Sequence, residues 1–409
     1  MEVDGESYKS WAWWLDGLQA MRRTYSIPMD AKEARIRADL EEERMKAFRL
    51  AAAEALRKGQ LMGWIGKRND PEVGEDEVPE AAKYQKKLED EQTEMYLRQE
   101  REEEDEEDWS ETCRYPRKWK YMHGVWRGST YEDTTGIPAM RFTDVKPHWR
   151  ACSTGTLQIF SFKVAAIATE LGWPLDVYGI IAVRDHLDRK RNIIFDRPRH
   201  NCQTITSEDP YLTLVGPIRA PVLSDVSYSV RFEVVLKVKS GTNESEDKDL
   251  SLLSSKYRSF YTNPTRAISR VATSKLSKLE WRFGHIANSV EATISIQVIH
   301  GSWPNGCRGV FGASTISLYD MKDSLLCLED DKLPVNIDGM INLSRHVACV
   351  EIDGELKISV TIEYVDGEQM TSKDETIFAP REAGRISAIL KVWSCEMKVV
   401  VAWSLVCSH

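Results

Sequence analysis

The side chains best suited to chemistry lie in one short stretch, residues 184–197, where carboxylates alternate with guanidinium groups. Arginine can hold an oxyanion through two parallel hydrogen bonds, so a basic turn of this kind could bind a phosphate or an acidic partner. A simpler interpretation is a solvent-facing turn whose charges pair with one another, and we favour it. The candidate binding residues are Arg184, Asp185, Asp188, Arg189, Arg191, Asn192 and Arg197.

Aspartates near the same turn raise another hypothesis, a Ca²⁺ site, because clustered loop carboxylates on a β-sandwich can bind this ion. They are Asp176, Asp185, Asp188 and Asp196. Arginine and lysine side chains in the same stretch offset their charge, which favours ion pairing over metal binding. We therefore predict no metal ligands and no cofactor, and we keep Ca²⁺ or phosphate binding as an alternative.

A second patch interleaves bases with aromatic rings between residues 114 and 127. Its candidate residues are Arg117, Lys118, Trp119, Lys120 and Trp126. Such a patch could stack on single-stranded nucleic acid and neutralise its phosphates. However, the net charge of the chain is −9, and residues 30–108 alone, with 25 acidic and 15 basic residues, have a net charge of −10. The rest of the chain therefore has a net charge of +1. Because a neutral domain does not attract nucleic acid, we favour aromatics that anchor the chain onto a folded domain.

Motifs of the familiar enzyme classes are missing from the sequence. The eight cysteines contain no Cys-x-x-Cys pair, which argues against a zinc site or a disulfide scaffold. No phosphate-binding Gly-x-x-x-x-Gly-Lys loop and no Gly-x-Ser-x-Gly elbow occurs, and the histidines lack metal-ligand spacing. The start has no apolar signal segment, and no apolar run reaches ~18 residues. We expect a non-enzymatic cytoplasmic protein, with the nucleus as the alternative location.

The first 110 residues are charged and rich in strong helix formers. Met45 and Phe48 on one predicted helix, and Leu88 and Met95 on another, give narrow apolar stripes suited to a coiled coil or a protein contact. Seven consecutive acidic residues at 102–108 predict a solvated, disordered stretch. We expect a helical arm over 1–110, a connecting segment over 111–150 and a β-sandwich domain over 151–409.

Beyond residue 155 the hydrophobic period changes to two. Apolar and polar residues alternate over 226–239, 290–298, 356–364 and 397–405, which is typical of antiparallel sheets with one wet face. We predict a mainly β fold, an antiparallel two-sheet β-sandwich behind the helical arm. The apolar run 177–183 lacks polar alternation and predicts a central strand. Asp353-Gly354 predicts a hairpin between 347–352 and 355–364, and the polar stretch 243–278 predicts a long loop with some helix.

Several separate motifs in this β region resemble an uncharacterised plant family that is common in grasses. They are Trp173–Gly179, Val183–Asn192, Asn201–Gln203, Asp209–Leu212, Leu214–Arg219, Phe378–Gly384 and Val401–Leu405. The resemblance covers about residues 155–407. Members of that family occur alone or joined to ribosome-inactivating, rRNA N-glycosidase domains. The resemblance implies no established activity, substrate or catalytic residue.

The joined N-glycosidase domains carry Glu-Ala-x-Arg, and Glu382–Arg385 matches it superficially. Pro380 and Gly384 predict a loop that enters a strand instead of the buried helix that the chemistry requires, so we expect no depurination. The preferred function is non-catalytic binding or scaffolding of proteins through sandwich loops and the arm. The alternative is an accessory module of ribosome-directed defence, with a nucleic acid or ribosome partner that the net charge does not support.

Overall fold

The computed structural model describes residues 112, 114–124, 128–145, 151–223, 229–258, 264–318, 321, 323–328, 332–364 and 371–407. The predicted helical arm, with Met45, Phe48, Leu88 and Met95, lies outside these residues, and so does Trp126. Residues 114–119 are helical and continue into η1 (Lys120–Gly124). No helix in the described part of the chain has the length and apolar character of a membrane span.

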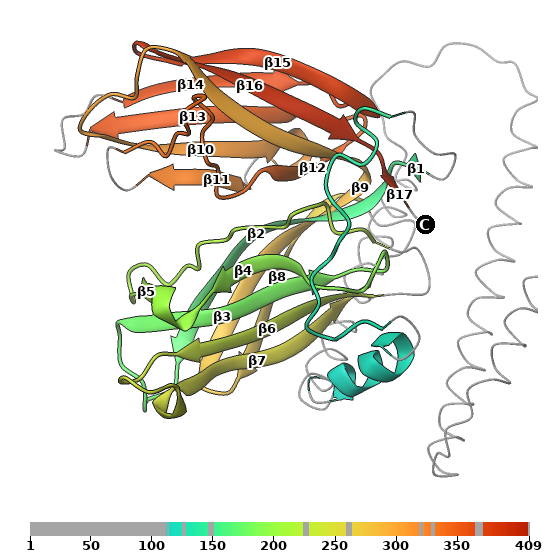
Figure 1. Cartoon of the computed structure of the whole chain (residues 1–409), viewed down its shortest axis with the longest axis vertical. Coiled ribbons are helices and arrows are strands. Elements are labelled where there is room, and N and C mark those ends of the chain that lie inside the picture. Colours follow the sequence, from blue (N-terminus) through green and yellow to red (C-terminus); the bar gives the residue numbers. More distant parts are fainter. Residues whose placement is uncertain are drawn as a thin grey trace, which may run out of the picture. The chain divides into compact units, whose positions relative to one another are not determined.

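The first half of the described β region forms one sandwich (Figure 1). One sheet has the order β4-β3-β6-β7, with β5 also paired to β3; the other side is built from β2, β8 and the first half of β9. Their bounds are β2 (Thr154–Ile167), β3 (Leu175–Arg184), β4 (Asn192–Arg197), β5 (Gln203–Ile205), β6 (Val230–Val238), β7 (Lys248–Tyr257), β8 (Arg266–Ser274) and β9 (Ser277–His300). Phe232 meets Phe162, Trp281 and Phe283 across the core at ring distances of 5.0–6.3 Å.

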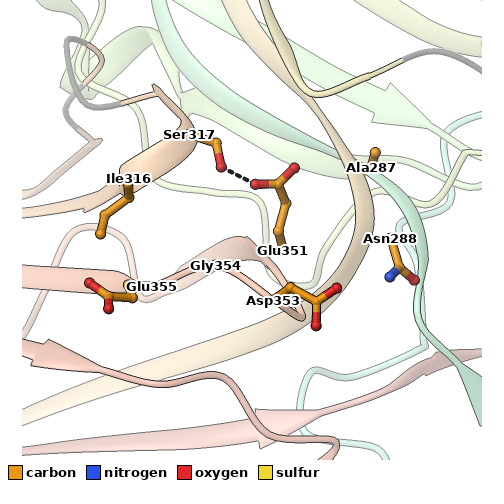
Figure 2. Close-up of a pocket in the computed structure, with 8 residues that line it drawn as sticks. All are labelled: Ala287, Asn288, Ile316, Ser317, Glu351, Asp353, Gly354 and Glu355. Carbon is orange, nitrogen blue, oxygen red and sulfur yellow. Dashed lines mark hydrogen bonds between the residues drawn. The ribbon is translucent and has the colours of Figure 1, made fainter. Parts of the chain in front are cut away.

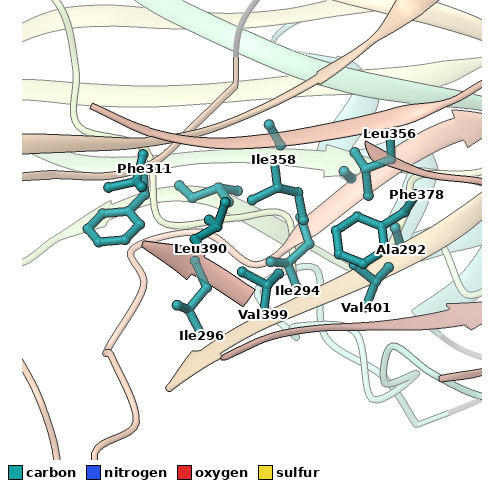
Figure 3. Packing of buried hydrophobic residues seen from close by; sticks show 14 of the residues in the cluster. Ala292, Ile294, Ile296, Phe311, Leu356, Ile358, Phe378, Leu390, Val399 and Val401 are labelled. Carbon is teal, nitrogen blue, oxygen red and sulfur yellow. The ribbon is translucent and has the colours of Figure 1, made fainter. Parts of the chain in front are cut away.

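A second sandwich follows, and β9 takes part in it as well. The sheet β11-β10-β13-β14 packs on β12-β9-β16-β15. Their bounds are β10 (Cys307–Thr315), β11 (Asp323–Leu328), β12 (Val347–Glu351), β13 (Leu356–Tyr364), β14 (Thr371–Phe378), β15 (Ala383–Val392) and β16 (Cys395–Ser404). Figure 3 shows Ile294 and Val401 meeting Ile358 and Phe378 in its core. A short pair, β1 (Ala151–Cys152) with β17 (Val406–Cys407), stands apart.

Strand β9 is 24 residues long and connects the two sandwiches. Residues 277–289 pair with β2, and residues 277–285 pair with β8. From residue 289 onward the partners are β12 and β16. It supplies buried side chains to two separate cores, and the buried positions change from odd numbers (Leu279, Trp281, Phe283) to even numbers (Val290, Ala292, Ile294) where the partners change.

A buried polar layer also joins the two sandwiches. Arg345, 3 % exposed, pairs with Asp323 of β11 and donates to the carbonyls of Ile159 at 2.6 Å and Gly216 at 2.7 Å. Gln158 of β2 donates to Asp323 at 2.5 Å. Burial raises the pKa of Asp323 to about 7, although Arg345 and Gln158 lower it. Buried polar groups that are fully paired in this way fix one arrangement of the elements around them.

The mainly β, antiparallel fold class is confirmed, since every pairing between the named strands is antiparallel. The apolar run 177–183 is part of β3, which has β6 on one side and β4 and β5 on the other. Its predicted central position in the sheet is therefore confirmed, because β3 has strand partners along both edges.

The loop predicted over residues 243–278 is wrong. This stretch holds η3 (Glu244–Glu246) and then β7, β8 and the start of β9. Its serines, which suggested a loop, close the edge between β7 and the β8–β9 turn. Ser277 donates to the carbonyl of Leu250 at 2.9 Å, and Ser274 donates to that of Leu252 at 2.5 Å. Serine satisfies backbone groups at this edge, which is why a polar sequence forms strands here.

The hairpin predicted around Asp353-Gly354 is also wrong. β12 pairs with β9, whereas β13 pairs with β10 and β14 in the opposite sheet. The turn is thus an arch that crosses the core between two sheets. Alternation specifies which face of a strand is buried but not which strand lies beside it, so both connections fit the same sequence.

The first core contains a buried Tyr257–His285 pair whose contribution to stability depends on pH. The Tyr257 hydroxyl lies 2.8 Å from Nδ1 of His285, which is 2 % exposed. Burial lowers the pKa of His285 to about 4, and Arg266 acts in the same direction. The unfolded chain therefore takes up a proton near pH 6.5 that the folded protein does not bind until about pH 4.

We expect the free energy of unfolding to fall by about 3 kcal/mol between pH 6.5 and pH 4 because of His285. His285→Asn, which keeps an acceptor near Tyr257 but does not titrate, should lose this part of the slope. Urea unfolding at half-unit pH steps measures it. An unchanged slope in the variant would show that His285 is not the group responsible.

Candidate functional site

The charged turn predicted from the sequence is largely internal. Arg184 and Asn192 are 2 % and 1 % exposed. Arg184 donates from Nε to Glu233 at 2.8 Å and from Nη2 to the carbonyl of Tyr131 at 2.6 Å. Its guanidinium carbon lies 3.9 Å from the centre of the Tyr131 ring. Arg191 pairs with the same Glu233 at 2.5 Å, so both arginines hold the connecting segment against β6.

The two aspartates of this turn are paired inside the protein as well. Arg219 binds Asp185 through two hydrogen bonds of 2.5 and 3.0 Å. Burial raises the pKa of Asp185, but Arg219 outweighs it and holds that pKa below its usual value. Asp188 accepts the Thr135 hydroxyl at 2.6 Å. The predicted solvent-facing turn whose charges pair with one another is therefore wrong, because the pairs are buried and their partners, Glu233 and Arg219, lie outside the turn.

Asn192 and Arg189 belong to the same internal network. Asn192 donates to the carbonyl of Arg219 at 2.9 Å and accepts the amide of Ile218 at 3.0 Å. Arg189 has φ 58° and presents its carbonyl to Trp119. Arg197 is half-buried, and its Nε has no acceptor among the described residues.

The basic-aromatic patch consists of a buried tryptophan and exposed basic residues. Trp119 is 1 % exposed, and its Nε1 donates to the carbonyl of Arg189 at 2.9 Å. Its ring meets Tyr131 edge to face at 5.6 Å. Arg117, Lys118 and Lys120 remain exposed. The tryptophan thus anchors the chain onto the first sandwich, as the favoured interpretation of the patch expected.

The four aspartates considered for Ca²⁺ do not share one site. Asp176 accepts the Thr204 hydroxyl at 2.6 Å, Asp185 forms an ion pair with Arg219, and Asp196 is exposed. In the described ranges no three His, Cys, Asp or Glu side chains are arranged to hold a metal ion. Glu382 precedes β15, and Arg385 within it pairs with Asp144, so this segment is a loop that enters a strand.

A pocket that the sequence did not indicate lies where β9, η4 (Ile316–Leu318) and the β12–β13 arch meet (Figure 2). Its volume is about 430 Å³. Three segments far apart in the chain line it: Ala287, Asn288, Ile316, Ser317, Glu351, Asp353, Gly354 and Glu355. Glu351, Asp353 and Glu355 surround a turn that the sequence indicated only as a connection between strands.

Backbone hydrogen bonds fix the walls of this pocket. Asn288 lies at φ 44°, and its carbonyl accepts the amide of Ile352 at 2.9 Å. The amide of Gly354 donates to the carbonyl of Glu351 at 3.0 Å, which closes the arch. The hydroxyl of Ser153 donates to Oδ1 of Asn288 at 2.5 Å. The pocket is therefore set by the fold and needs no rearrangement to exist.

The pocket is negatively charged. Glu351 accepts the hydroxyls of Thr265 and Ser317, which orient its carboxylate. Figure 2 shows the bond from Ser317. Asp353 is exposed and Glu355 is half-exposed. No lysine or arginine is among the residues that line the pocket. Carboxylates without a neighbouring base attract a cationic group and accept its hydrogen bonds.

Comparison with known proteins gives one family and several distant structures. The domain of unknown function DUF6598 matches residues 156–401. No curated protein matches the chain significantly. Among solved structures, the paired C2 domains of Extended-Synaptotagmin 2 align at 9% identity over 67% of this chain and 100% of that one, with a TM-score of 0.21. Human GIVD cytosolic phospholipase A2 aligns at 8% identity over 62% and 33%, with a TM-score of 0.19. Both TM-scores are too low to relate the chain to either protein.

Proposed function

Since the chain belongs to the family of the domain of unknown function DUF6598, which carries no assigned activity, we propose its function from the pocket itself. The protein is a non-catalytic binding scaffold. It receives a basic side chain of a partner protein in the carboxylate-lined pocket at the β12–β13 arch. The observation that carries this proposal is a preformed cavity of about 430 Å³ with three carboxylates and no base in its lining.

The distribution of charge elsewhere supports this choice of site. Asp185, Glu233 and Asp323 are each paired with an arginine inside the protein. Asp353 and Glu355 have exposed surface at the pocket instead. A partner's guanidinium would replace water around these carboxylates and gain charge-assisted hydrogen bonds, each worth about 1.5–3 kcal/mol.

The proposal is tested with an array of 12-residue peptides that have a fixed central arginine and otherwise random sequence, against the matching array with citrulline. We expect arginine peptides to bind and citrulline peptides to bind at least 10-fold more weakly, because citrulline keeps the shape but not the charge. Raising the salt concentration from about 50 to 300 mM should weaken binding several-fold, since the carboxylates face solvent.

Two variants locate the binding. Asp353→Asn with Glu355→Gln should lower the affinity for the selected arginine peptides at least 10-fold. Glu244→Gln, on the exposed turn η3, removes the same kind of charge away from the pocket and should leave binding unchanged. Equal binding by the citrulline array, or by the double variant, would refute the proposal.

A further inference from the structure

The turn between β11 and β12 presents an isoleucine entirely to solvent. Ile337 is 110 % exposed, and Val335 on the same turn and Ile299 at the end of β9 are each 47 % exposed. Central turn positions usually hold Pro, Asp, Asn, Ser or Gly. A β-branched apolar residue at this point contradicts the local preference, and such contradictions are expected at functional sites.

The turn is held firmly, so the exposure of Ile337 is built in. The amide of Gly339 donates to the carbonyl of Asn336 at 3.0 Å, and the amide of Asn336 donates to the carbonyl of Met340 at 2.8 Å. Side chains add further bonds: Gln297 donates to the carbonyl of Asp338 at 2.7 Å. Gly339 lies at φ +82°, and a Cβ there would come within 2.6 Å of the carbonyl oxygen of Val298.

The base of the turn is part of the second core. Ile341 is 5 % exposed, and Leu333 and Leu343 pack against the same cluster. Two backbone bonds of 2.9 Å join the turn to β9: the amide of Val298 donates to the carbonyl of Gly339, and that of Ile341 donates to Ile296. The turn thus has a base fixed in the core and an apolar side chain at its tip. Anchor residues of protein interfaces are presented in this way, because a conformation that is fixed before binding costs less entropy on binding.

We propose that Ile337 is the anchor of a second contact surface and inserts into an apolar pocket of a partner protein. The charge of the turn indicates a protein over a lipid surface. Residues 333–343 contain Asp338 but no lysine or arginine, so an anionic membrane would repel the tip. One isoleucine also supplies too little apolar area to hold a protein on a bilayer. The partner pocket is expected to have a basic rim that pairs with Asp338.

This surface is separate from the carboxylate-lined pocket. The pocket uses Ala287 and Asn288 of β9, whereas the turn bonds to residues 296–298 of the same strand. About ten residues of extended strand correspond to about 30 Å. The two surfaces can therefore hold different partners at once, and loss of one leaves the other intact.

The test uses a phage-displayed library of random 12-residue peptides, selected on the full chain and depleted on Ile337→Ser. Selected peptides should be apolar with basic flanks, and Ile337→Ser should weaken their binding at least 10-fold, or about 1.4 kcal/mol. Ile377→Ser removes an isoleucine of 54 % exposure from β14 and should leave binding unchanged. Binding of arginine peptides to the carboxylate-lined pocket should be the same in all three proteins.

Two results would overturn the proposal. The first is that no peptide remains after selection on the full chain and depletion on Ile337→Ser. The second comes from vesicles of phosphatidylcholine with and without phosphatidylserine: sedimentation of the chain with either, lost in Ile337→Ser, would assign the tip to membranes instead.

Discussion

Arg345→Met is expected to lower the free energy of unfolding by about 3–5 kcal/mol, because it leaves Asp323 buried without its cation. The carbonyls of Ile159 and Gly216 lose their donor in the same step. Urea unfolding of the full chain measures the loss. Arg308→Met, which breaks the exposed pair with Glu363, should cost no more than about 1 kcal/mol.

The loss caused by Arg345→Met should also depend on pH. In the intact protein the raised pKa of Asp323, about 7, means that stability from this group is highest at low pH and falls as pH rises towards 7. Without Arg345 that pKa moves higher, so the decline continues above pH 7. The difference between variant and unchanged protein should therefore be larger at pH 8.5 than at pH 6. A loss of less than about 1.5 kcal/mol that is equal at both pH values would contradict the role given to this pair.

Removal of residues 1–150 is expected to destroy the cooperative fold, whereas removal of residues 1–110 should preserve it. The connecting segment supplies Trp119, Tyr131 and Phe142, all less than 9 % exposed. Trp119→Ala alone should lower the free energy of unfolding by about 3–5 kcal/mol. Its loss together with that of Tyr131 also uncovers Arg184 and its pair with Glu233.

Thermal unfolding of fragments 111–409 and 151–409 measures this difference. The longer fragment should melt in one transition like the full chain, and the shorter one should aggregate or melt without cooperativity. Trp119→Ala in fragment 111–409 provides the intermediate case. If fragment 151–409 melts at the same temperature as fragment 111–409, the connecting segment does not contribute to the fold.

The sequence was sufficient for the sheet character but not for its connections. Alternation over 290–298 and 356–364 predicted strands, because a pleated strand places every second side chain in the core. Alternation does not show which strand lies beside another, so the sequence predicts a hairpin at Asp353-Gly354 where the structure has an arch. The division into two cores depends on β9 changing partners near Ser289, where its apolar positions shift from odd to even numbers. Such a shift does not show which strands lie beside each half.

The candidate site was harder to predict for a related reason. Arg184 pairs with Glu233, which lies 49 positions away in the sequence, and Asp185 pairs with Arg219, which lies 34 positions away. Spacing within one turn showed that charges were concentrated there, but partners so distant could not be identified from it. The pocket joins residues 287–288, 316–317 and 351–355. Only the fold brings these segments together, so no local motif could have indicated them.

The central claim is that the carboxylate-lined pocket is where this scaffold binds its partner. Hydrogen–deuterium exchange of the full chain, with and without an arginine peptide selected from the array, tests this claim most directly. We predict slower exchange at residues 286–289 and 351–355, and no such change with the citrulline peptide or in the Asp353→Asn, Glu355→Gln variant. Protection at another part of the chain, with these two segments unchanged, would contradict it.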